Sequence, residues 1–425
     1  MSRFVYSLLI YLLLPFIPLK LLWRGWRQPE YRQHWAERFG FFSVPVAKPL
    51  IWLHCVSVGE TRGAAPLIKE LQQRYPHYQI LLTHATPTGR EAGQQLFGDS
   101  VLRCYLPYDT PGAVARFLRY FRPSIGLLME TEIWFNLIAG CKTNAIPLLL
   151  VNARLSARSA RGYARLGRLV SDGLRQLTAI AAQTNEDAQR LQSLVSEYGQ
   201  HLPVEVMGNL KFDVMPPPEA SRQGEVLRGY FSRTRPVFLA ASTRDGEEAM
   251  ILDAVAAARL SQLLTVIVPR HPQRFDEVAS LLAKRGIRFV RRSKLAERLP
   301  DDVEVVLGDS MGEMFAYYAA CDVAFIGGSL QPLGGQNLIE ATAMGTPVLI
   351  GPHTFNFAVA TEMAIAVNAA WRVQDLAELA NALQRLFGDA AMRHDMSREA
   401  LAFSASAGGA TQRITNLVAR YLPVS

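Results

Sequence analysis

Cysteine is scarce in this chain of 425 residues, and the four that occur, Cys55, Cys104, Cys141 and Cys321, lie far apart. No Cys-x-x-Cys pair exists, which excludes a zinc ribbon and a disulfide framework and suits a reducing compartment. The chain also lacks an Asp-x-Asp pair and a His-Glu-x-x-His motif. Enzymes that hold a divalent ion generally need such a set, so a metal-dependent transferase is disfavoured.

The chain has only a small excess of positive charge. It contains 45 Lys and Arg residues and 37 Asp and Glu residues, which gives a net charge of +8. That excess suits acidic substrates or an anionic membrane face, but it is too diffuse to indicate nucleic-acid binding. Neither a P-loop nor a Gly-x-Gly-x-x-Gly fingerprint occurs. With 49% hydrophobic residues and about three times the length of a typical domain of roughly 150 residues, the chain is globular and multidomain.

The longest apolar run lies at the N-terminus, from Phe4 to Leu22, and is borderline for a membrane span of about 20 residues. No small-residue cleavage site follows, which disfavours a signal peptide. Tryptophans and arginines then alternate over residues 23–38, as is typical of the headgroup level. Only Arg3 precedes the run, so the positive-inside rule predicts a cytoplasmic location for the rest. We expect an uncleaved membrane-anchor helix over residues 1–24; the alternative is the buried first helix of a soluble domain.

Short apolar runs alternate with helical patterns from Leu50 onward, which is typical of a parallel sheet covered by helices on both faces. Three consecutive prolines at 216–218 interrupt the pattern, which then restarts. We therefore predict two Rossmann-like, doubly wound α/β domains over residues 25–215 and 216–425, with the active cleft between them and ligands outside the carboxyl ends of the strands. The predicted strands are 50–56, 79–83, 125–129, 146–151, 179–182, 237–240, 264–268, 303–306, 323–326 and 348–350.

Acidic side chains follow two predicted strands of the N-terminal domain. Glu60, in SVGETRG, opens a helix, where it either balances the helix dipole or removes a proton from a substrate hydroxyl. In METEIW, one of Glu130 and Glu132 is expected to cap or start a helix and the other to line the cleft. Arginines between 154 and 165 form either a solvated helix face or a site for acceptor phosphates. Lys211 lies just before the predicted domain boundary.

Three loops of the C-terminal domain carry residues suited to a nucleotide. VPRHP places Arg270 between prolines that fix the backbone. The SMGEM segment is expected to begin a helix that Ser310 or Asp309 caps. The free N–H groups of the first turn of this helix would hold a phosphate. The glycines of GGS and GGQNLIE let the backbone approach a ligand, and Glu340 suits a ribose diol. Together the three loops indicate a nucleotide-sugar site.

These segments together resemble the 3-deoxy-D-manno-octulosonic acid (Kdo) transferases of lipopolysaccharide biosynthesis. The resemblance rests on LHCVSVGETRGAAPLI, METEIW, VNARLSARSARGY, GNLKFD, ASTRDGEE, VPRHPQRF, SMGEM, FIGGSL, GGQNLIEA and GPHTFNF, in that order and spacing. It implies a two-domain GT-B glycosyltransferase on the cytoplasmic side of the inner membrane, working without a cofactor. The implied donor is CMP-Kdo, and the implied acceptor is the tetra-acylated lipid A precursor, lipid IVA.

The resemblance also implies roles for single residues. Glu60 matches the catalytic base of the family, and Glu130 and Lys211 match residues thought to stabilise the transition state. The residues that match the CMP-binding segments are Pro269, Arg270, Met311, Gly312, Glu313, Asn337, Leu338, Ile339 and Glu340. The chain departs from the family pattern at three positions, Gln336, Leu338 and Arg244.

The expected reaction is a direct displacement with inversion at the anomeric carbon of Kdo. Glu60 takes the proton of the acceptor's primary hydroxyl, and CMP leaves as a phosphate monoester, which needs no metal. The helix start at Gly312 and a cation, Arg270 or Lys211, would meet the charge on the leaving phosphate. Two alternatives stay open: a GT-B transferase that moves a UDP-sugar to another lipid carrier, and a non-catalytic, membrane-anchored nucleotide-binding scaffold.

Overall fold

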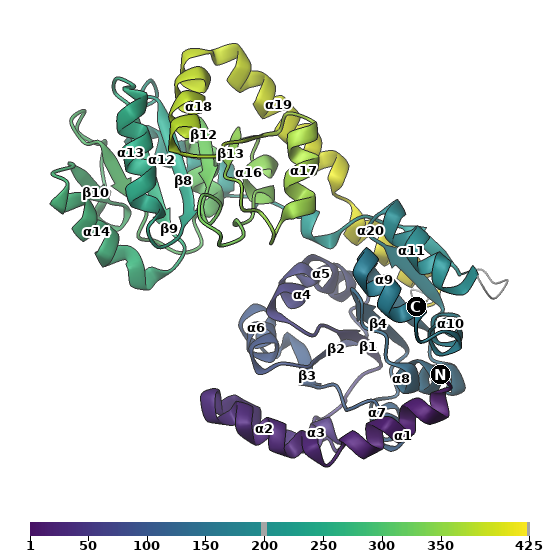
Figure 1. The fold of residues 1–425 in the computed structure, drawn as a ribbon. Helices are drawn as coiled ribbons and strands as arrows, with labels where there is room; N and C mark the ends of the chain where they lie inside the picture. Colours follow the sequence, from purple (N-terminus) through teal and green to yellow (C-terminus); the bar gives the residue numbers. More distant parts are fainter. Residues whose placement is uncertain (197–201, 423–425) are drawn as a thin grey trace. The chain divides into compact units, whose positions relative to one another are not determined.

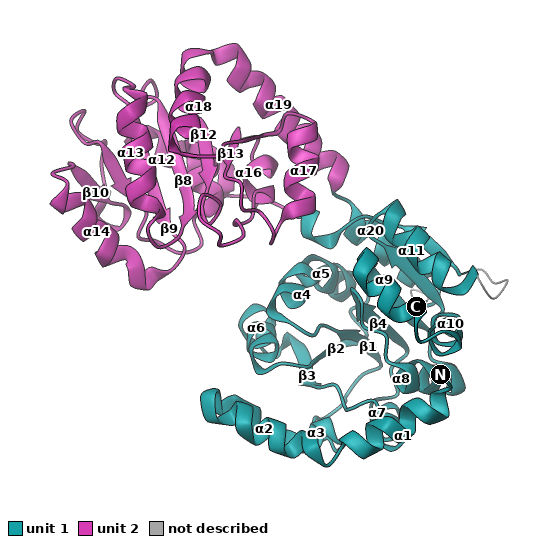
Figure 2. Cartoon of the chain, viewed as in Figure 1, with its two compact units in different colours: residues 1–213, 408–425 teal, residues 214–407 magenta. Residues whose placement is uncertain are grey.

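The computed structural model describes residues 1–196 and 202–422, which fold into two compact units (Figure 1). Unit 1 comprises Met1–Asp213 and Gly408–Ser425, and unit 2 comprises Val214–Ala407 (Figure 2). Each unit has its own seven-stranded sheet, in which all neighbouring strands pair in parallel. The predicted pair of doubly wound α/β domains is therefore confirmed.

Unit 1 has the strand order β3-β2-β1-β4-β5-β6-β7, so the chain starts in the middle, runs to one edge and then crosses to the other side. Its strands are β1 (Leu50–His54), β2 (Gln79–His84), β3 (Val101–Tyr105), β4 (Ile125–Met129), β5 (Leu148–Ala153), β6 (Ala179–Ala182) and β7 (Val204–Val206). Its helices are α1 (Arg3–Leu13), α2 (Phe16–Arg27), α3 (Trp35–Arg38), α4 (Val58–Gly63), α5 (Ala65–Arg74), α6 (Pro87–Phe97), α7 (Pro111–Phe121), α8 (Phe135–Thr143), α9 (Ala157–Ala164), α10 (Arg168–Leu174), α11 (Asn185–Ser196) and α20 (Ala410–Ala419), with short 3₁₀ turns η1 (Pro29–Arg32), η2 (Gly98–Ser100) and η3 (Leu210–Phe212).

Unit 2 repeats this topology with the order β10-β11-β9-β8-β12-β13-β14. Its strands are β8 (Val237–Thr243), β9 (Leu264–Pro269), β10 (Phe289–Arg291), β11 (Val305–Leu307), β12 (Val323–Ile326), β13 (Val348–Ile350) and β14 (Ala370–Arg372). Its helices are α12 (Ala220–Phe231), α13 (Glu247–Ala258), α14 (Phe275–Lys284), α15 (Met314–Ala320), α16 (Ile339–Ala343), α17 (Ala358–Ala366), α18 (Leu376–Gly388) and α19 (Ala390–Ala407), with 3₁₀ turns η4 (Pro272–Arg274) and η5 (Arg292–Lys294).

The central strands are apolar on both faces because helices cover both faces of each sheet. In unit 1 every residue of β1 and β4 is buried. Trp52 of β1 is fully buried, and its Nε1 donates a hydrogen bond to Thr83 Oγ1 on β2 at 2.8 Å. The indole also covers Gly126 of β4, where an added Cβ would lie 2.7 Å from the ring. Tight packing here holds β1 and β4 at a fixed separation.

The chain's last helix belongs to unit 1, so the prediction that residues 216–425 form one domain is wrong for its C-terminal part. Ile414 and Leu417 of α20 pack in the core cluster that also contains Leu67 and Leu71 of α5. The Asp213 carboxylate accepts a hydrogen bond from the Ala410 N–H at 3.2 Å. The apolar face of α20 is buried against α5, and this tertiary packing cannot be deduced from position in the chain.

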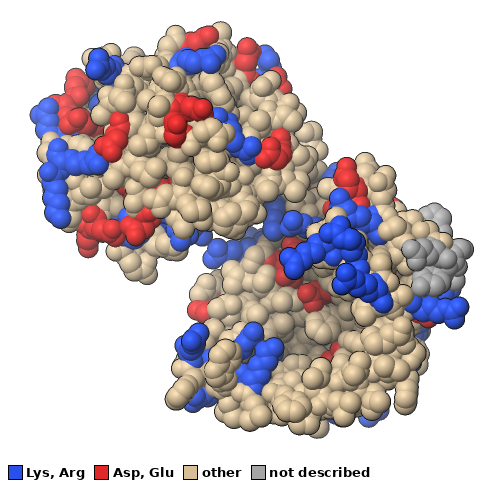
Figure 3. All heavy atoms as spheres, in the orientation of Figure 1, with Lys and Arg blue, Asp and Glu red and all other residues tan. Residues whose placement is uncertain are grey.

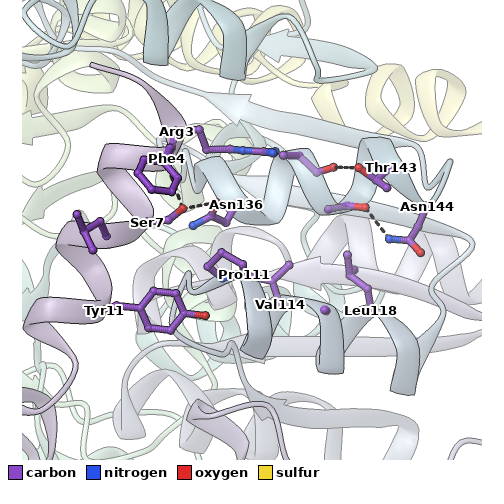
Figure 4. A pocket seen from close by; sticks show the side chains of 14 residues that line it. Arg3, Phe4, Ser7, Tyr11, Pro111, Val114, Leu118, Asn136, Thr143 and Asn144 are labelled. Atoms are coloured by element: carbon purple, nitrogen blue, oxygen red, sulfur yellow. Dashed lines mark hydrogen bonds between the residues drawn. The ribbon is translucent and has the colours of Figure 1, made fainter.

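The N-terminal segment forms two helices in place of the single anchor helix that was predicted. Among the described residues no single helix is long and apolar enough to cross a membrane; α1 and α2 reach that length only together, and the chain bends by 53° between them. No residue of α1 is buried, which contradicts the alternative of a buried first helix. Polar contacts attach α1 to the rest of unit 1. The Tyr6 hydroxyl donates to Asp109 Oδ2 at 2.8 Å. The Ser7 hydroxyl donates to Asn136 Oδ1 at 3.0 Å (Figure 4).

Candidate functional site

Glu60 occupies the third position of α4, directly after β1, as the sequence predicted. Ser57 is the N-cap, and its hydroxyl accepts from the Glu60 N–H at 3.3 Å and donates to Glu60 Oε1 at 2.9 Å. Glu60 Oε2 accepts from the Val56 N–H at 2.8 Å. This is a capping-box arrangement, so the carboxylate stabilises the helix start and is also aimed at the end of β1. Burial, as the largest cause, raises the pKa of Glu60 above its ordinary value.

Glu130 follows β4 with an unusual backbone conformation. Its φ is +57°, a left-handed value that is uncommon for residues other than glycine, asparagine and aspartate. Its N–H donates to Val151 O of β5 at 3.0 Å, which keeps the residue at the sheet edge. The Lys211 ammonium lies 3.7 Å from Glu130 Oε1. Strained conformations of this kind cluster at functional sites, and here the strain places a carboxylate beside a lysine.

Glu132 also lies at this edge, but neither acid of the METEIW segment caps a helix, so that expectation is wrong. Helix α8 begins at Phe135, and the Asp109 carboxylate accepts from its first N–H groups, those of Asn136 at 3.0 Å and Leu137 at 2.8 Å. Glu132 Oε2 instead accepts from Trp134 Nε1 at 2.7 Å. Burial, with the charges of Glu60 and Glu130, raises the pKa of Glu132 to about 7.

These acidic residues converge because of the strand order. Strands β1 and β4 are neighbours, and the chain leaves them toward opposite sides of the sheet. Ligands of doubly wound sheets bind at such a switch point, outside the carboxyl ends of the strands. Glu60 follows β1, and Glu130 and Glu132 follow β4, so all three acids lie at the carboxyl ends of these two neighbouring strands. The unit 1 edge therefore carries three acids and one lysine, a set suited to proton abstraction from a hydroxyl.

Arginines in and next to α9 lie beside this edge and are exposed to solvent. Arg154, Arg158, Arg161 and Arg165 are all exposed. Figure 3 shows basic side chains gathered over α9. Their exposure agrees with the interpretation as a solvated helix face. A cluster of guanidinium groups is also suited to bidentate contacts with phosphate.

In unit 2 the predicted donor residues lie at the carboxyl ends of β9, β11 and β12, and β9 and β12 flank the central β8. Arg270, directly after β9, donates from Nε to Gln336 Oε1 at 3.2 Å. Asn337 Nδ2 donates to Glu340 Oε1 at 3.2 Å, and Asn337 Oδ1 accepts from the Ile339 N–H at 3.0 Å. Burial raises the pKa of Glu340, and the nearby Arg270 lowers it. An arginine, an amide and a half-buried acid thus share one edge.

Two departures from the family pattern surround a glycine of this edge. Gly328 has a φ of +72°, and an added Cβ would lie 3.1 Å from Gln336 Nε2 and 3.4 Å from Arg244 Cγ. The backbone there passes close to both side chains, which only glycine permits. Gln336 and Arg244 therefore form part of the same wall, so these departures from the family pattern lie at the site itself.

The other predicted donor residues differ in what they can offer a ligand. Leu338 and Ile339 are buried, so their side chains belong to the core and only their backbone lies at the loop. Pro269 is the last residue of β9, and Met311 is exposed. Glu313 Oε1 accepts from Arg292 Nη2 at 2.8 Å.

The prediction that Ser310 or Asp309 caps a helix in the SMGEM segment is wrong. Helix α15 begins at Met314, with Glu313 at the N-cap position and no side-chain capping hydrogen bond. Asp309 accepts instead from the Ser293 N–H at 2.8 Å, and the hydroxyl of Ser310 lies 2.8 Å from that of Tyr317. Gly312, with a φ of +82°, turns the chain before the helix.

Three residues that lie against the acids of the unit 1 edge were not predicted from the sequence: Ser57, Trp134 and His54. Ser57 could have been found from the Ser-x-x-Glu spacing of a capping box. His54 is buried within a strand, and its position near Glu132 depends on the pairing of β1 and β4. The described residues contain no group of three or more His, Cys, Asp or Glu placed to hold a metal ion.

Two doubly wound units, each with polar residues at its switch point, define a GT-B-type fold as found in glycosyltransferases. The solved structure of a glycosyltransferase from Rickettsia africae has this fold: it superposes with a TM-score of 0.55 at 15% identity, covering 89% of this chain and 100% of that one.

The particular family follows from closer relatives. A model of the 3-deoxy-D-manno-octulosonic-acid transferase (kdotransferase) family matches residues 33–214. The 3-deoxy-D-manno-octulosonic acid transferase of Bordetella pertussis is 42% identical over 99% of this chain and 100% of its own length. The enzyme of the same name from Haemophilus influenzae is 39% identical over 99% of both chains. The chain belongs to the Kdo transferase family and is a glycosyltransferase.

Proposed function

We propose that this enzyme transfers Kdo from CMP-Kdo to a hydroxyl group of lipid IVA, with inversion at the anomeric carbon. The observation that carries the proposal is Glu60: a carboxylate held by Val56 and Ser57 at the switch point of unit 1, whose raised pKa makes it a better base. As the hydroxyl oxygen attacks the anomeric carbon, its proton passes to Glu60 and the bond to the CMP phosphate breaks. One displacement gives inversion.

Lys211 and Glu130 support this step in the proposal. Their contact at 3.7 Å supports this role, because it keeps a cation at the edge where the anionic sugar would bind. A preorganised ammonium group stabilises negative charge that develops in the transition state. The carboxylate of Glu130 in turn keeps the lysine in place.

Donor binding is proposed for unit 2. Arg270 supplies a cation for the CMP phosphate, and Gln336 holds its side chain in position. Glu340 accepts hydrogen bonds from the ribose hydroxyls, and Asn337 holds its side chain in position. The backbone of the glycine-rich loop after β12 approaches the nucleotide. The leaving group is already a phosphate monoester, so the proposal requires no metal ion or other cofactor.

Lipid IVA carries phosphates, and the exposed arginines of α9 would bind them. The acyl chains require a membrane, and α1 and α2 present large apolar side chains to solvent, with Phe4 78% and Trp26 85% exposed. We therefore place the enzyme at the cytoplasmic side of the inner membrane, attached through these two helices.

The acceptor and the stereochemistry are tested together. Purified enzyme is incubated with lipid IVA and either CMP-Kdo or UDP-sugars, and the product is examined by mass spectrometry and by NMR of the new linkage. Transfer from CMP-Kdo alone, with inverted configuration, supports the proposal. Transfer from a UDP-sugar supports the second GT-B alternative, and absence of any transfer with retained nucleotide binding supports the scaffold.

Membrane attachment is tested with substitutions that leave the polar contacts of α1 intact. Phe4→Glu combined with Phe16→Glu removes two apolar side chains that are largely exposed. We expect the double variant to bind anionic vesicles more weakly. The binding that remains should fall further as salt is added, because salt screens the attraction between arginines and lipid headgroups. Val226→Glu, at an exposed apolar residue of α12, is the matched control. Unchanged sedimentation of the double variant with vesicles contradicts the attachment.

A further inference from the structure

Glu132 is the acid of the unit 1 edge to which the proposed mechanism assigns no role. Its side chain is 23% exposed, and Trp134 Nε1 donates to its Oε2 at 2.7 Å. His54 Nε2 lies 3.9 Å from the same oxygen, too far for a hydrogen bond but close enough for a small rotation or one water to connect them.

His54 is a fully buried ring whose protonation can be deduced. Its Nδ1 lies 3.1 Å from Thr83 O, which only accepts, and 2.9 Å from Thr83 Oγ1, whose own hydrogen is donated to Leu53 O at 3.3 Å. Both neighbours of Nδ1 therefore act as acceptors, so Nδ1 carries the hydrogen. Burial, followed by the nearby His84, lowers the pKa of His54 to about 3, so the ring is neutral and Nε2 is an acceptor. Within the described structure this Nε2 is buried without any hydrogen-bond partner. His54 therefore offers Glu132 no positive charge; it needs a donor.

The charges around Glu132 also favour its protonated form. Glu60 of α4 and Glu130 after β4 add negative charge, and Tyr163 of α9 is a neutral neighbour. The cation of this edge, Lys211, is 3.7 Å from Glu130. Burial is the largest cause that raises the pKa of Glu132 to about 7, and only the Trp134 hydrogen bond acts against it. A protonated carboxyl group could donate to His54 Nε2, whereas a carboxylate could not.

We propose that Glu132 is a positioning residue that works in its protonated form, keeping a third negative charge away from Glu60 and Glu130 while anionic substrates bind. The inference deepens the proposed function and rests on it for the identity of those substrates. Both carry negative charge, the donor on its phosphate and sugar carboxylate and the acceptor on its phosphates. Ionisation of Glu132 would repel both, so the enzyme would lose efficiency as pH rises.

The first experiment measures kcat/KM for transfer across pH in three forms of the enzyme. In the wild type we expect an alkaline limb that falls about tenfold per pH unit above the apparent pKa of Glu132. Glu132→Gln keeps the shape without an ionisable proton, so its limb should vanish while efficiency near pH 6, about one unit below that pKa, stays within about threefold of wild type. Trp134→Phe removes the donor that favours the carboxylate, so its limb should move to higher pH. A limb unchanged in both variants, or one uniform loss at every pH, overturns the proposal.

The second experiment needs no substrate. Infrared difference spectra of wild type minus Glu132→Gln should show the C=O stretch of a protonated carboxyl group below about pH 6 that disappears by about pH 9. Absence of this band at low pH shows that Glu132 is ionised throughout and overturns the inference. If the band titrates as expected while no transfer to lipid IVA occurs, the proposed acceptor has failed but the protonated state of Glu132 stands.

Discussion

Glu60→Gln separates the capping contacts that the structure shows for this side chain from its proposed role as the base. The amide keeps the length of the carboxylate, its Oε1 can accept from the Val56 N–H, and its Nε2 can donate to the Ser57 hydroxyl. Only the base is lost. General bases typically contribute about 10²–10⁴-fold, so we expect kcat to fall at least about 10²-fold.

The stability of this variant should change little, for a reason that the site supplies. The raised pKa of Glu60 shows that folding disfavours its charge, so removing the charge relieves a cost. Against this gain stands weaker helix-dipole and hydrogen-bond stabilisation of about 0.3–1 kcal/mol. The net effect on unfolding free energy should be within about 1 kcal/mol, or about 2–4 °C in Tm for a unit of this size.

Ser57→Ala is the matched control, because it removes the helix cap and keeps the carboxylate. Loss of an N-cap costs about 0.5–2 kcal/mol, so Tm should fall more than in Glu60→Gln. The Ser57 hydrogen bond lowers the pKa of Glu60, and without it that pKa rises further. The acid limb of the rate profile should then move to higher pH, with kcat above that limb within about tenfold of wild type.

The assay is single-turnover Kdo transfer measured beside thermal unfolding for both variants. A stable Glu60→Gln enzyme with a wild-type rate would falsify the assignment of Glu60 as the base. Equal losses of rate and stability in Glu60→Gln and Ser57→Ala would leave Glu60 with a capping role only.

Three further predictions concern the donor site, metal dependence and the core. Glu340→Gln should raise the KM for CMP-Kdo about tenfold or more, since a hydrogen bond to a charged group is worth about 1.5–3 kcal/mol, whereas Glu362→Gln, at an exposed acid paired with Arg372, should leave KM unchanged. EDTA should not alter the transfer rate, and a strict requirement for Mg²⁺ or Mn²⁺ would contradict the proposed displacement. Gly126→Ala should destabilise unit 1 by about 1–3 kcal/mol in calorimetry because its Cβ would meet Trp52 and Leu148, while Gly162→Ala, with open space around it, should be neutral or stabilising.

Local sequence determined the central strands and their order along the chain. Four of the predicted strands, 125–129, 179–182, 323–326 and 348–350, coincide with β4, β6, β12 and β13. These strands can be recognised as continuous apolar runs in the sequence, because both of their faces are buried. The strands that were not predicted are β3, β7, β10 and β14, which are the edge strands of the two sheets. An edge strand is partly exposed, so its composition resembles that of a loop.

The candidate site shows the same division between local and tertiary information. The Ser57–Glu60 capping box is a pattern within four residues, and Glu60 could therefore be placed at a helix start from sequence alone. The left-handed backbone of Glu130 and the buried acceptor atom of His54 have no local signature. Both depend on which strands are neighbours in the sheet.

The sequence by itself determined the fold class, the presence of two α/β units and the candidate residues of the site. Each of these rests on a local feature: the spacing of buried residues, the turn residues or a short motif. Only the tertiary structure decided where those elements meet. It joined α20 to unit 1, divided the N-terminal run into two helices, and brought Glu132 beside Glu60 and His54. The physical reason is that the pairing of β1 with β4 and the packing of α20 on α5 bury surfaces that lie far apart in the chain.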